Sequence, residues 1–446
     1  MAISPFAASL LEQEARSLQA RLARVRPFVL IEPMVPAAAL LPSAQSAIER
    51  YLVIGRRKLH GTVAAFLKWL RASVPHASAA EAQRRFTFVR LQFNAALTQF
   101  DLFSDVITQR SETENGVWLG GLDVIAADAL ALPGDYYSAP PVICYLDRGP
   151  GAAIRRARTR LPGGGENPVA IIRVPRERMV GSGIASSLIH EVGHQGAALL
   201  DLVTSLRPVL QQKQQHPAER EVWQLWERWI SEIVADLWSL ARVGVVATLG
   251  LIGVVSLPRV FVFRLNGDDP HPIPWIRVKL GCVIGQALYP HPQWARLART
   301  WESFYPTDGL EPAARGLLQR LSASMPAFVA LLIAHRPASL RGRNLVEALE
   351  TGRRQPARLA ALYRAWSASP DKMYIAAPSL VFAVLGQARS DGHVSAEEEN
   401  VVLAKLLTHW ALRSTLDTSY LCADATLRSR SAAVTWQRPE QRPTIS

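Results

Sequence analysis

The stretch SSLIHEVGHQGAALL, residues 186–200, constrains the fold more than any other part of the chain. It places His190, Glu191 and His194 inside a run that is otherwise mostly apolar or small, which is typical of a helix packed into a core. Burying ionisable side chains without partners is costly. Either a bound metal ion supplies the partner, or this helix face is solvated.

The spacing of the two histidines favours the metal. Residues four apart lie on one face of an α-helix, one turn from each other, so His190 and His194 can bind the same ion. Glu191 would lie near the remaining, water-bearing position. Zinc lowers the pKa of such a water towards 7, and a carboxylate can accept its proton during attack on a carbonyl. This HExxH pattern predicts Zn²⁺ as cofactor and Glu191 as general base.

A catalytic zinc ion needs a third protein ligand. The candidate is Glu232 in WISEIVADLW, residues 229–238, which predicts a second long helix. Asp236 follows one turn later and could orient a histidine through its other ring nitrogen. Two alternatives remain open. Both carboxylates could belong to the polar face of an amphipathic helix, or another acid nearby could be the ligand, namely Glu219, Glu221 or Glu227.

HEVGH followed by ExxxD on a later helix resembles the gluzincin group of zinc peptidases. Within that group the chain is similar to the branch of the CAAX-prenyl proteases and the bacterial heat-shock membrane peptidase. That branch carries an HP…R element after the third ligand, which is matched by DPHPIPWIR, residues 269–277. The resemblance covers residues 168–280. The membrane members have several spanning helices that this chain lacks, so the resemblance implies a soluble relative.

The resemblance also implies roles for individual residues. It implies that His271 or Arg277 stabilises the tetrahedral oxyanion, which requires a donor aimed where negative charge develops. His271 could equally be a turn residue among prolines. The other roles match those derived from spacing: the metal ligands are His190, His194 and Glu232, the general base is Glu191, and Asp236 supports a ligand.

The rest of the chain predicts a mainly α fold with a small β-sheet, in which helical regions flank a zincin-like catalytic core. PPVICYL (residues 140–146) and PVAIIRV (residues 168–174) predict neighbouring strands. Residues 169–174 could form an exposed edge that binds extended peptide, or an ordinary interior strand. The expected organisation is an N-terminal helical region (1–110), the core (111–300), a C-terminal helical region (301–435) and a disordered tail (436–446).

Finer boundaries follow from local signals. Residues 113–121 predict a break in the helical pattern, and residues 181–183 predict the N-cap of a helix that runs to about residue 205. A second helix is predicted over 217–240, and residues 264–280 predict an irregular segment. Residues 243–257 are the one membrane-helix candidate, but 15 residues are too few to span, which favours a buried core helix.

Charge and leader signals exclude several classes of protein. The net charge is +13, but the arginines are scattered and lack interleaved aromatic residues, so nucleic-acid binding is not expected. The N-terminus has no basic start followed by an apolar core. These features predict a cytoplasmic, bacterial protein without a membrane setting. Three widely spaced cysteines without a CxxC pair predict no disulfide framework.

The C-terminal region carries a weaker pattern. QARSDGHVSAEEENVVLAKLL, residues 387–407, resembles the acidic helical motif of tellurite-resistance (TerB-like) domains, and Asp391 with residues 397–399 could bind a cation. The alternative is a surface helix whose start is capped by Ser395 and Glu398.

These patterns predict a zinc-dependent metalloendopeptidase that acts on a protein or peptide substrate. The helical flanks would serve as a scaffold or bind a partner protein. The alternative is a non-catalytic scaffold protein of a larger assembly that keeps a zincin-like fold. An intact Glu191 favours the enzyme, because a structural metal site has no use for a base beside it.

Overall fold

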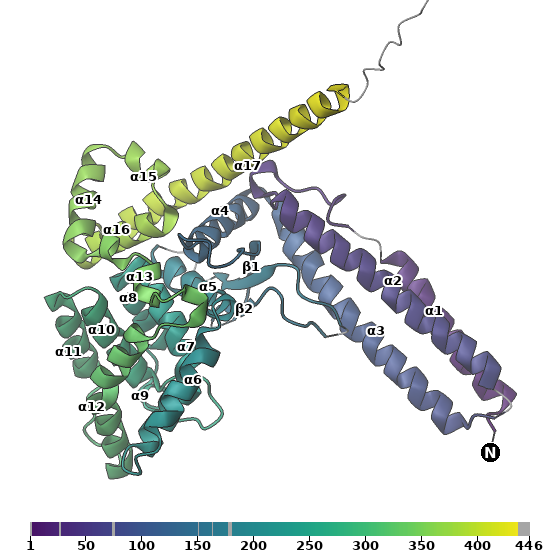
Figure 1. The fold of residues 1–446 in the computed structure, drawn as a ribbon, viewed down its shortest axis with the longest axis horizontal. Helices are drawn as coiled ribbons and strands as arrows, with labels where there is room; N and C mark the ends of the chain where they lie inside the picture. Colours follow the sequence, from purple (N-terminus) through teal and green to yellow (C-terminus); the bar gives the residue numbers. More distant parts are fainter. Residues whose placement is uncertain are drawn as a thin grey trace, which may run out of the picture.

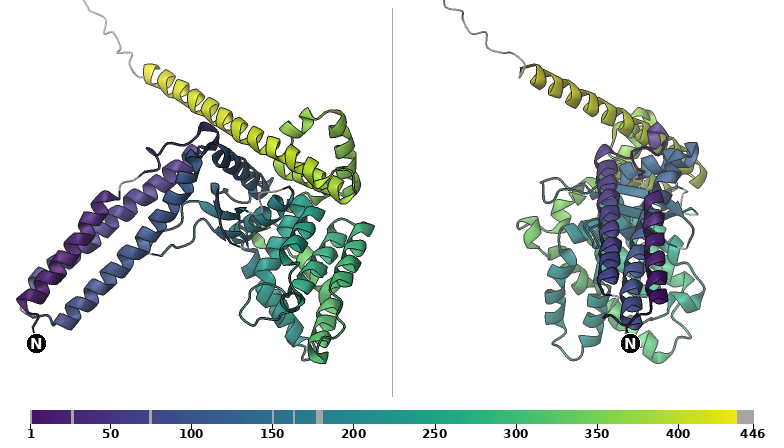
Figure 2. Two further views of the ribbon diagram at one scale, coloured as in Figure 1. Left: turned by 180° about the vertical axis from the view of Figure 1, so that it is seen from behind. Right: turned by 90° about the vertical axis from the view of Figure 1, so that its right-hand side faces the viewer.

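Helices build most of the chain around one small sheet. The computed structural model describes residues 2–25, 28–73, 76–149, 151–162, 164–176 and 181–435. Over these residues the predicted mainly α fold with a small β-sheet is confirmed. A three-helix arm projects from a helical body, and the sheet lies between them (Figure 1). The two further views show the same elongated arm from behind and from its end (Figure 2).

The arm consists of α1 (Pro5–Arg24), α2 (Pro42–Ser73) and α3 (Ala79–Thr108). Two of its helices start at serine caps, which satisfy backbone N–H groups that a helix leaves free. Ser4 accepts a hydrogen bond from Ala7, and Ser78 accepts one from Glu81, each over 3.2 Å. The arm has its own hydrophobic cluster, which includes Leu18, Leu22, Leu59, Val63, Phe66, Leu70, Phe86 and Phe93.

The sheet contains β1 (Val142–Asp147), β2 (Ala153–Arg155) and β3 (Ala170–Pro175) in the order β1-β3-β2. Strand β3 pairs parallel with β1 and antiparallel with β2. The strands predicted from residues 140–146 and 168–174 are therefore neighbours. Because β3 is central, the edge interpretation of residues 169–174 is wrong, and β2 forms the edge on that side.

The sheet is covered on both faces. Ile143 and Ile171 belong to a cluster with Phe103 at the base of the arm. Cys144 and Ile172, on the opposite face, belong to the core of the body. The arm and the body therefore meet across the sheet, which explains why both β1 and β3 are apolar along almost their whole length.

Five helices form the centre of the body: α4 (Thr113–Leu130), α5 (Gly183–Leu199), α6 (Leu202–Lys213), α7 (Arg220–Val243) and α8 (Val245–Val255). Glycines let α5 approach α7 closely. A Cβ atom on Gly193 would lie 2.9 Å from the backbone of Ala235, and one on Gly196 would lie 2.5 Å from the ring of Trp238. This close approach fixes the spacing between the two helices that carry the HExxH and ExxxD patterns.

The remaining helices enclose the body. One hydrophobic cluster runs from Leu119 in α4 to Trp410 in α17 (Ala396–Thr435), so α4 and the C-terminal helices share a core. The predicted cap of α17 is present: Ser395 and Glu398 accept each other's backbone N–H groups, over 3.1 and 2.9 Å. The helices that enclose the body are α9 (Arg259–Val262), α10 (Pro274–Leu288), α11 (Pro292–Phe304), α12 (Pro312–Ala334), α13 (Leu345–Ala348), α14 (Pro356–Ala368), α15 (Asp371–Ile375), α16 (Pro378–Ser390) and α17 (Ala396–Thr435).

The predicted break at residues 113–121 is wrong, because α4 runs through them. Its glycines mark close packing. A Cβ atom on Gly120 would lie 2.4 Å from the carbonyl oxygen of Ala37, and one on Gly121 would lie 2.5 Å from that of Leu407. Glycine in a helix is tolerated where another backbone comes this close.

Two other boundaries also differ from the prediction. The helix expected to reach residue 205 ends at Leu199, and Asp201 has left-handed backbone angles before α6 begins. The irregular segment expected over 264–280 gives way to α10 at Pro274, because proline is well suited to the first turn of a helix. Arg277 therefore lies on a helix. The predicted disordered tail, 436–446, falls outside the described residues.

The membrane-helix candidate also changes. The helix within residues 243–257 is α8, which has 11 residues and is only partly buried. Among the described residues, α12 is the one helix that is long and apolar enough to cross a membrane. Its side that includes Leu321, Met325 and Phe328 is buried in the body.

Candidate metal centre

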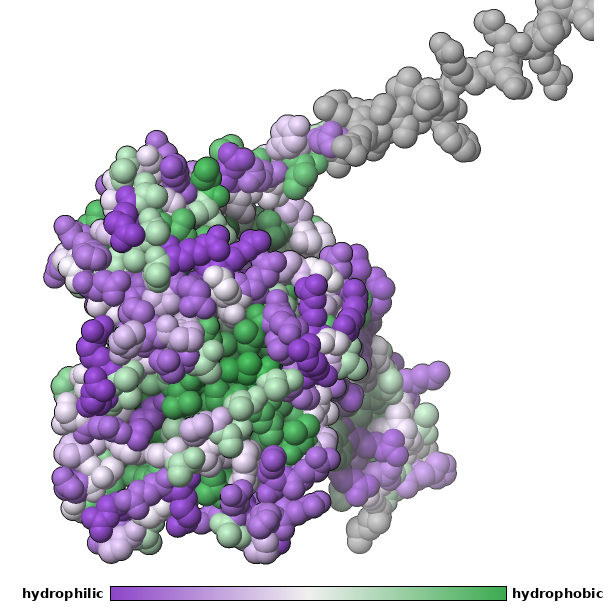
Figure 3. All heavy atoms as spheres, turned by 60° about the vertical axis from the view of Figure 1, so that its left-hand side comes forward, coloured by the Kyte–Doolittle hydropathy of each residue, from purple (hydrophilic) through white to green (hydrophobic). Residues whose placement is uncertain are grey.

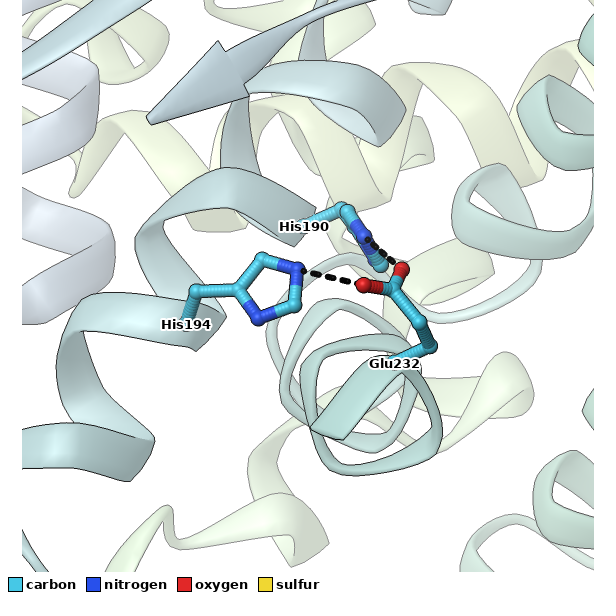
Figure 4. A group of neighbouring side chains, drawn as sticks. All are labelled: His190, His194 and Glu232. Atoms are coloured by element: carbon cyan, nitrogen blue, oxygen red, sulfur yellow. Dashed lines mark hydrogen bonds and ion pairs between the residues drawn. The ribbon is translucent and has the colours of Figure 1, made fainter. Parts of the chain in front are cut away.

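Two crossing helices bring the predicted ligands together. His190 and His194 lie one turn apart on α5, and Glu232 lies on α7. Both imidazole rings point at the Glu232 carboxylate (Figure 4). Nε2 of His190 lies 3.2 Å from one carboxylate oxygen, and Nε2 of His194 lies 3.4 Å from the other. Among the described residues these three form the one cluster of His, Cys, Asp and Glu side chains that could hold a metal ion.

The distances fit a zinc ion. In a tetrahedral site, bonds of about 2.0–2.2 Å to nitrogen and oxygen separate neighbouring ligand atoms by about 3.3–3.6 Å. The ligand atoms here are 3.2 and 3.4 Å apart along the two histidine–glutamate edges, and all lie within 4.8 Å of one another. Two imidazoles and one carboxylate are also a donor set that catalytic zinc sites use.

Asp236 contacts His190 on the side of the ring opposite Glu232. Its Oδ1 lies 2.8 Å from Nδ1 of His190, so the aspartate faces the ring nitrogen that is turned away from Glu232. A proton on Nδ1 leaves the Nε2 lone pair free for a metal. Arg277, one turn into α10, holds Asp236 in turn with two hydrogen bonds of 2.7 and 2.9 Å. The aspartate is thus fixed between a histidine and a guanidinium.

His271, in the segment between α9 and α10, and Arg277, on α10, reach the same centre. Nε2 of His271 lies 3.2 Å from Oε2 of Glu232, and its Nδ1 lies 2.7 Å from Oδ1 of Asp269. A guanidinium nitrogen of Arg277 lies 3.5 Å from the same Glu232 oxygen. His271 is therefore more than a turn residue, because it contacts the ligand carboxylate. The sequence analysis did not predict the contact between Asp269 and His271. It also missed Ser231, whose Oγ lies 3.5 Å from Nδ1 of His194.

The electrostatics of the cluster are dominated by burial and by opposite charges. Burial alone would lower the pKa of His190, but the carboxylates of Asp236 and Glu232 outweigh it and raise that pKa to about 9. Burial would raise the pKa of Glu232, yet hydrogen bonds from His190, His194 and His271 hold it well below its usual range. The Glu232 carboxylate is therefore charged, as a metal ligand must be.

Glu191 occupies a different environment. It lines the same cavity, of about 140 Å³, as His190, Asp236, His271 and Arg277. It accepts no hydrogen bond from a described residue that would stabilise its charge, and burial raises its pKa above the usual value. A carboxyl group with a raised pKa beside a metal site is suited to accept and return a proton.

The cavity has two walls that the sequence did not reveal. Gly151 and Ala152, immediately before edge strand β2, form one of them. Apolar residues of α8 form the other, namely Ala247, Leu251 and Val254. No local pattern marks these residues, because only the packing of α8 and of β2 against α5 brings them to the candidate metal centre.

The alternative acids on α7 have other partners. Glu219 accepts a hydrogen bond from Trp223, Glu221 pairs with Arg320, and Glu227 accepts from two glutamine side chains. None of them joins the cluster with His190 and His194. The sequence left open which acid of α7 is the third candidate ligand. In the structure Glu232 is the one that contacts both histidines.

The acids of the C-terminal motif likewise have protein partners. Asp391 accepts a hydrogen bond from Gln387, and Glu398 accepts one from the backbone N–H of Ser395 at the start of α17. Buried Glu399 forms an ion pair with Arg389 over 2.7 Å. Over the described residues these acids do not gather into a cation site. The capped-helix interpretation therefore accounts for them.

Comparison with known proteins adds no relative. No family model, no curated protein and no solved structure matched this chain. The interpretation of the centre consequently depends on its geometry and chemistry.

Proposed function

We propose that the chain is a zinc-dependent metalloendopeptidase that hydrolyses peptide bonds in a protein or peptide substrate. One observation carries the proposal: His190 and His194 of α5 meet Glu232 of α7, 42 residues beyond the first histidine, at distances that suit a tetrahedral ion. The proposed zinc ion would polarise the substrate carbonyl and lower the pKa of a bound water.

The chain's own residues would then handle the proton. Glu191 would accept it from the water that adds to the carbonyl carbon and return it to the leaving amine nitrogen, so that one water is consumed and one peptide bond is broken. His271 and Arg277 would donate hydrogen bonds to the oxygen on which negative charge develops. Both line the cavity with Glu191, which supports these roles.

The sheet offers a place for the substrate backbone. Strand β2 pairs with β3 on one side only, and Gly151 and Ala152 lead into it along the cavity wall. An exposed strand edge binds extended peptide through backbone hydrogen bonds, with little dependence on sequence. An extended substrate on β2 would bring its backbone past Glu191.

Metal content tests the first part of the proposal. Purified protein should contain one zinc per chain, and His190→Ala should lose it, because two remaining ligands bind zinc weakly. His216→Ala is the matched control, since His216 is exposed in the turn between α6 and α7. Wild-type protein that takes up no zinc after dialysis against the metal would refute the proposal.

Proteolysis tests the second part. Glu191→Gln should keep its zinc and lose about 100-fold or more of the activity on unfolded casein and a mixed peptide library. Glu221→Gln, an exposed residue of α7, should behave like wild type. Zinc binding without cleavage of any substrate by the wild type would instead favour the non-catalytic scaffold protein.

A further inference from the structure

Four arginines follow one another along the chain that leads away from the metal cavity. Gly151 and Ala152 line that cavity, and strand β2 begins at the next residue. The arginines start at the last residue of β2 and continue into the segment after it, and all four are exposed: Arg155, Arg156, Arg158 and Arg160. Positive charge therefore lies along the continuation of one cavity wall.

The backbone of this arginine segment, residues 155–160, is fixed to the helix that carries the two histidines. The N–H of Ala157 donates a hydrogen bond of 2.8 Å to Oε1 of Gln195, which directly follows His194 on α5. Asn167, only 1% exposed, donates to the carbonyl oxygens of the two arginines before Ala157, over 3.1 Å each. The arginine segment thus has a set position relative to the candidate metal centre.

The positive charge of the segment is not neutralised by the described residues around it. None of the four arginines forms an ion pair with a described residue, and the side chains of Arg156 and Arg160 donate no hydrogen bond to one. Lys58 of α2 adds a further positive charge, since a Cβ atom on Gly164 would lie 2.7 Å from its Nζ. Glu166 is the one acidic residue in the sequence between the arginines and β3.

A cluster of this kind favours a carboxylate-bearing ligand. A single exposed ion pair contributes little, but several like charges held in one place attract and orient a ligand of opposite charge. Arginine also binds carboxylates through two parallel N–H groups. Residues 151–168 contain no aromatic ring on which a base could stack, and the segment continues a strand edge suited to peptide backbone. These features favour an acidic peptide over a nucleic acid.

The opposite wall of the metal cavity has a different character. Helix α8 contains no charged residue, and its Leu251 and Val254 line the cavity while remaining partly exposed. On the face of the body drawn in Figure 3, hydrophobic residues gather in one area that is bordered by hydrophilic ones. A peptide that passes the cavity would therefore meet an apolar wall at the metal and positive charge further along β2.

We propose that the substrate is an acidic peptide segment, bound along β2 with an apolar residue at the metal cavity and Asp or Glu side chains against the arginine segment. Arg155 is three residues beyond Ala152, which is about 10 Å along a strand, so the acidic side chains would lie about three to six residues from the cleaved bond. This inference rests on the proposed peptidase function and adds a charge preference to backbone contacts that have little sequence dependence of their own.

Fluorescence anisotropy with labelled peptides tests the preference on the full-length protein. The peptides share an apolar centre and carry a block of glutamate, glutamine or lysine about three to six residues before it or after it, because a peptide can pair with β2 in either direction. Binding is measured with Glu191→Gln, which should not cleave them. In at least one direction we expect glutamate to bind at least tenfold more tightly than glutamine, and lysine more weakly. Equal affinities for glutamate and glutamine peptides would overturn the proposal.

Charge reversal assigns the preference to the segment. Arg156→Glu combined with Arg160→Glu should make the lysine peptide bind more tightly than the glutamate peptide, and the unchanged melting temperature expected for exposed side chains would confirm the fold. The matched control combines Arg84→Glu and Arg358→Glu, which are exposed on α3 and α14 and change the net charge equally. The same reversal in the control would mean that net charge alone selects the peptide, and would overturn the proposal.

Two further measurements separate the alternatives. Tighter binding of an oligouridylate than of the glutamate peptide, lost on charge reversal, would assign the segment to nucleic acid and overturn the proposal. Cleavage by the wild type separates this inference from the proposed function. Equal kcat/KM for glutamate and glutamine peptides would leave the peptidase standing and refute the acidic preference. Tighter binding of glutamate peptides without any cleavage would support the acidic site and refute the peptidase.

Discussion

At the scale of single residues, the first prediction concerns Asp236, which contacts Nδ1 of His190. Asp236→Asn keeps the shape of the side chain but removes the charge that faces Nδ1 of His190. Groups that orient a histidine ligand are commonly worth about 10- to 100-fold in metal affinity. We therefore expect zinc to be bound about 10- to 100-fold more weakly, as measured by competition with a chelator. Gln224→Ala, exposed on α7, is the control, and an unchanged affinity in Asp236→Asn would contradict this role.

The second prediction concerns Arg277 and the free energy of unfolding, not the affinity for zinc. Its guanidinium donates two hydrogen bonds to Asp236, and both side chains are largely buried. Removing one partner of a buried ion pair leaves an uncompensated charge, at a cost of about 3–5 kcal/mol. Arg277→Ala should lose roughly this much free energy of unfolding, as measured by urea denaturation of protein stripped of metal by a chelator.

The loss in Arg277→Ala should depend on the charge that remains. In the background of Asp236→Asn the buried carboxylate is absent, so Arg277→Ala should cost less than it does in wild type. Equal costs in both backgrounds would show that the ion pair with Asp236 does not contribute to the stability that Arg277 provides. The comparison thus separates the ion pair from the volume of the arginine side chain.

At the scale of elements, Gly193 lies between the two histidines at the crossing of α5 and α7. Replacing glycine by alanine normally stabilises a helix by about 1 kcal/mol. Here the added methyl group would lie 2.9 Å from the backbone of Ala235 and from Cβ of Trp238. We expect Gly193→Ala to destabilise by about 1–3 kcal/mol and to weaken zinc binding, because the two helices must separate.

The matched control is Gly61→Ala. Gly61 lies within α2, and a Cβ atom there would meet nothing within 4 Å. This variant should be more stable than wild type by about 0.5–1 kcal/mol. Opposite signs for the two substitutions in thermal unfolding are the expected result, and a stabilising Gly193→Ala would mean that the helices are not held this close.

The same crossing shows what the sequence could predict. Histidines four apart and the acids of α7 were found because helical periodicity is local. The sequence also predicted two adjacent strands. It could not show that Gly120 and Gly121 pack against other backbones, so it predicted a break where α4 is continuous. Glycine indicates both turns and close helix contacts, and only the tertiary partner distinguishes them.

At the scale of the whole molecule, the sequence was least informative about how the regions join. Periodicity predicts that residues of the arm are helical, but Phe103 reaches the sheet only through the tertiary arrangement. The walls of the metal cavity likewise come from α8 and from the residues before β2. Such contacts between distant segments leave no local signal, whereas the candidate ligands His190, His194 and Glu232 were predictable because metal binding restricts the residue types.

The separate clusters in the arm and the body lead to a prediction for the whole molecule. Phe86 is buried in the arm cluster, away from the sheet, and Phe103 is buried where the arm meets β1 and β3. Each phenylalanine-to-alanine change should cost about 3–5 kcal/mol of local stability.

Because Phe86 contacts only the arm's own core, Phe86→Ala should increase hydrogen exchange in α1–α3 and leave exchange in α5 and α7 unchanged. Phe103→Ala should increase exchange in the arm and also in β1 and β3, of which β3 lies against α5. Hydrogen exchange read by mass spectrometry distinguishes the two patterns, and the zinc content of Phe86→Ala should equal that of wild type. If Phe86→Ala instead loosened α5 and α7, the arm and the metal centre would form one cooperative unit, and the arm would contribute directly to the stability of the site.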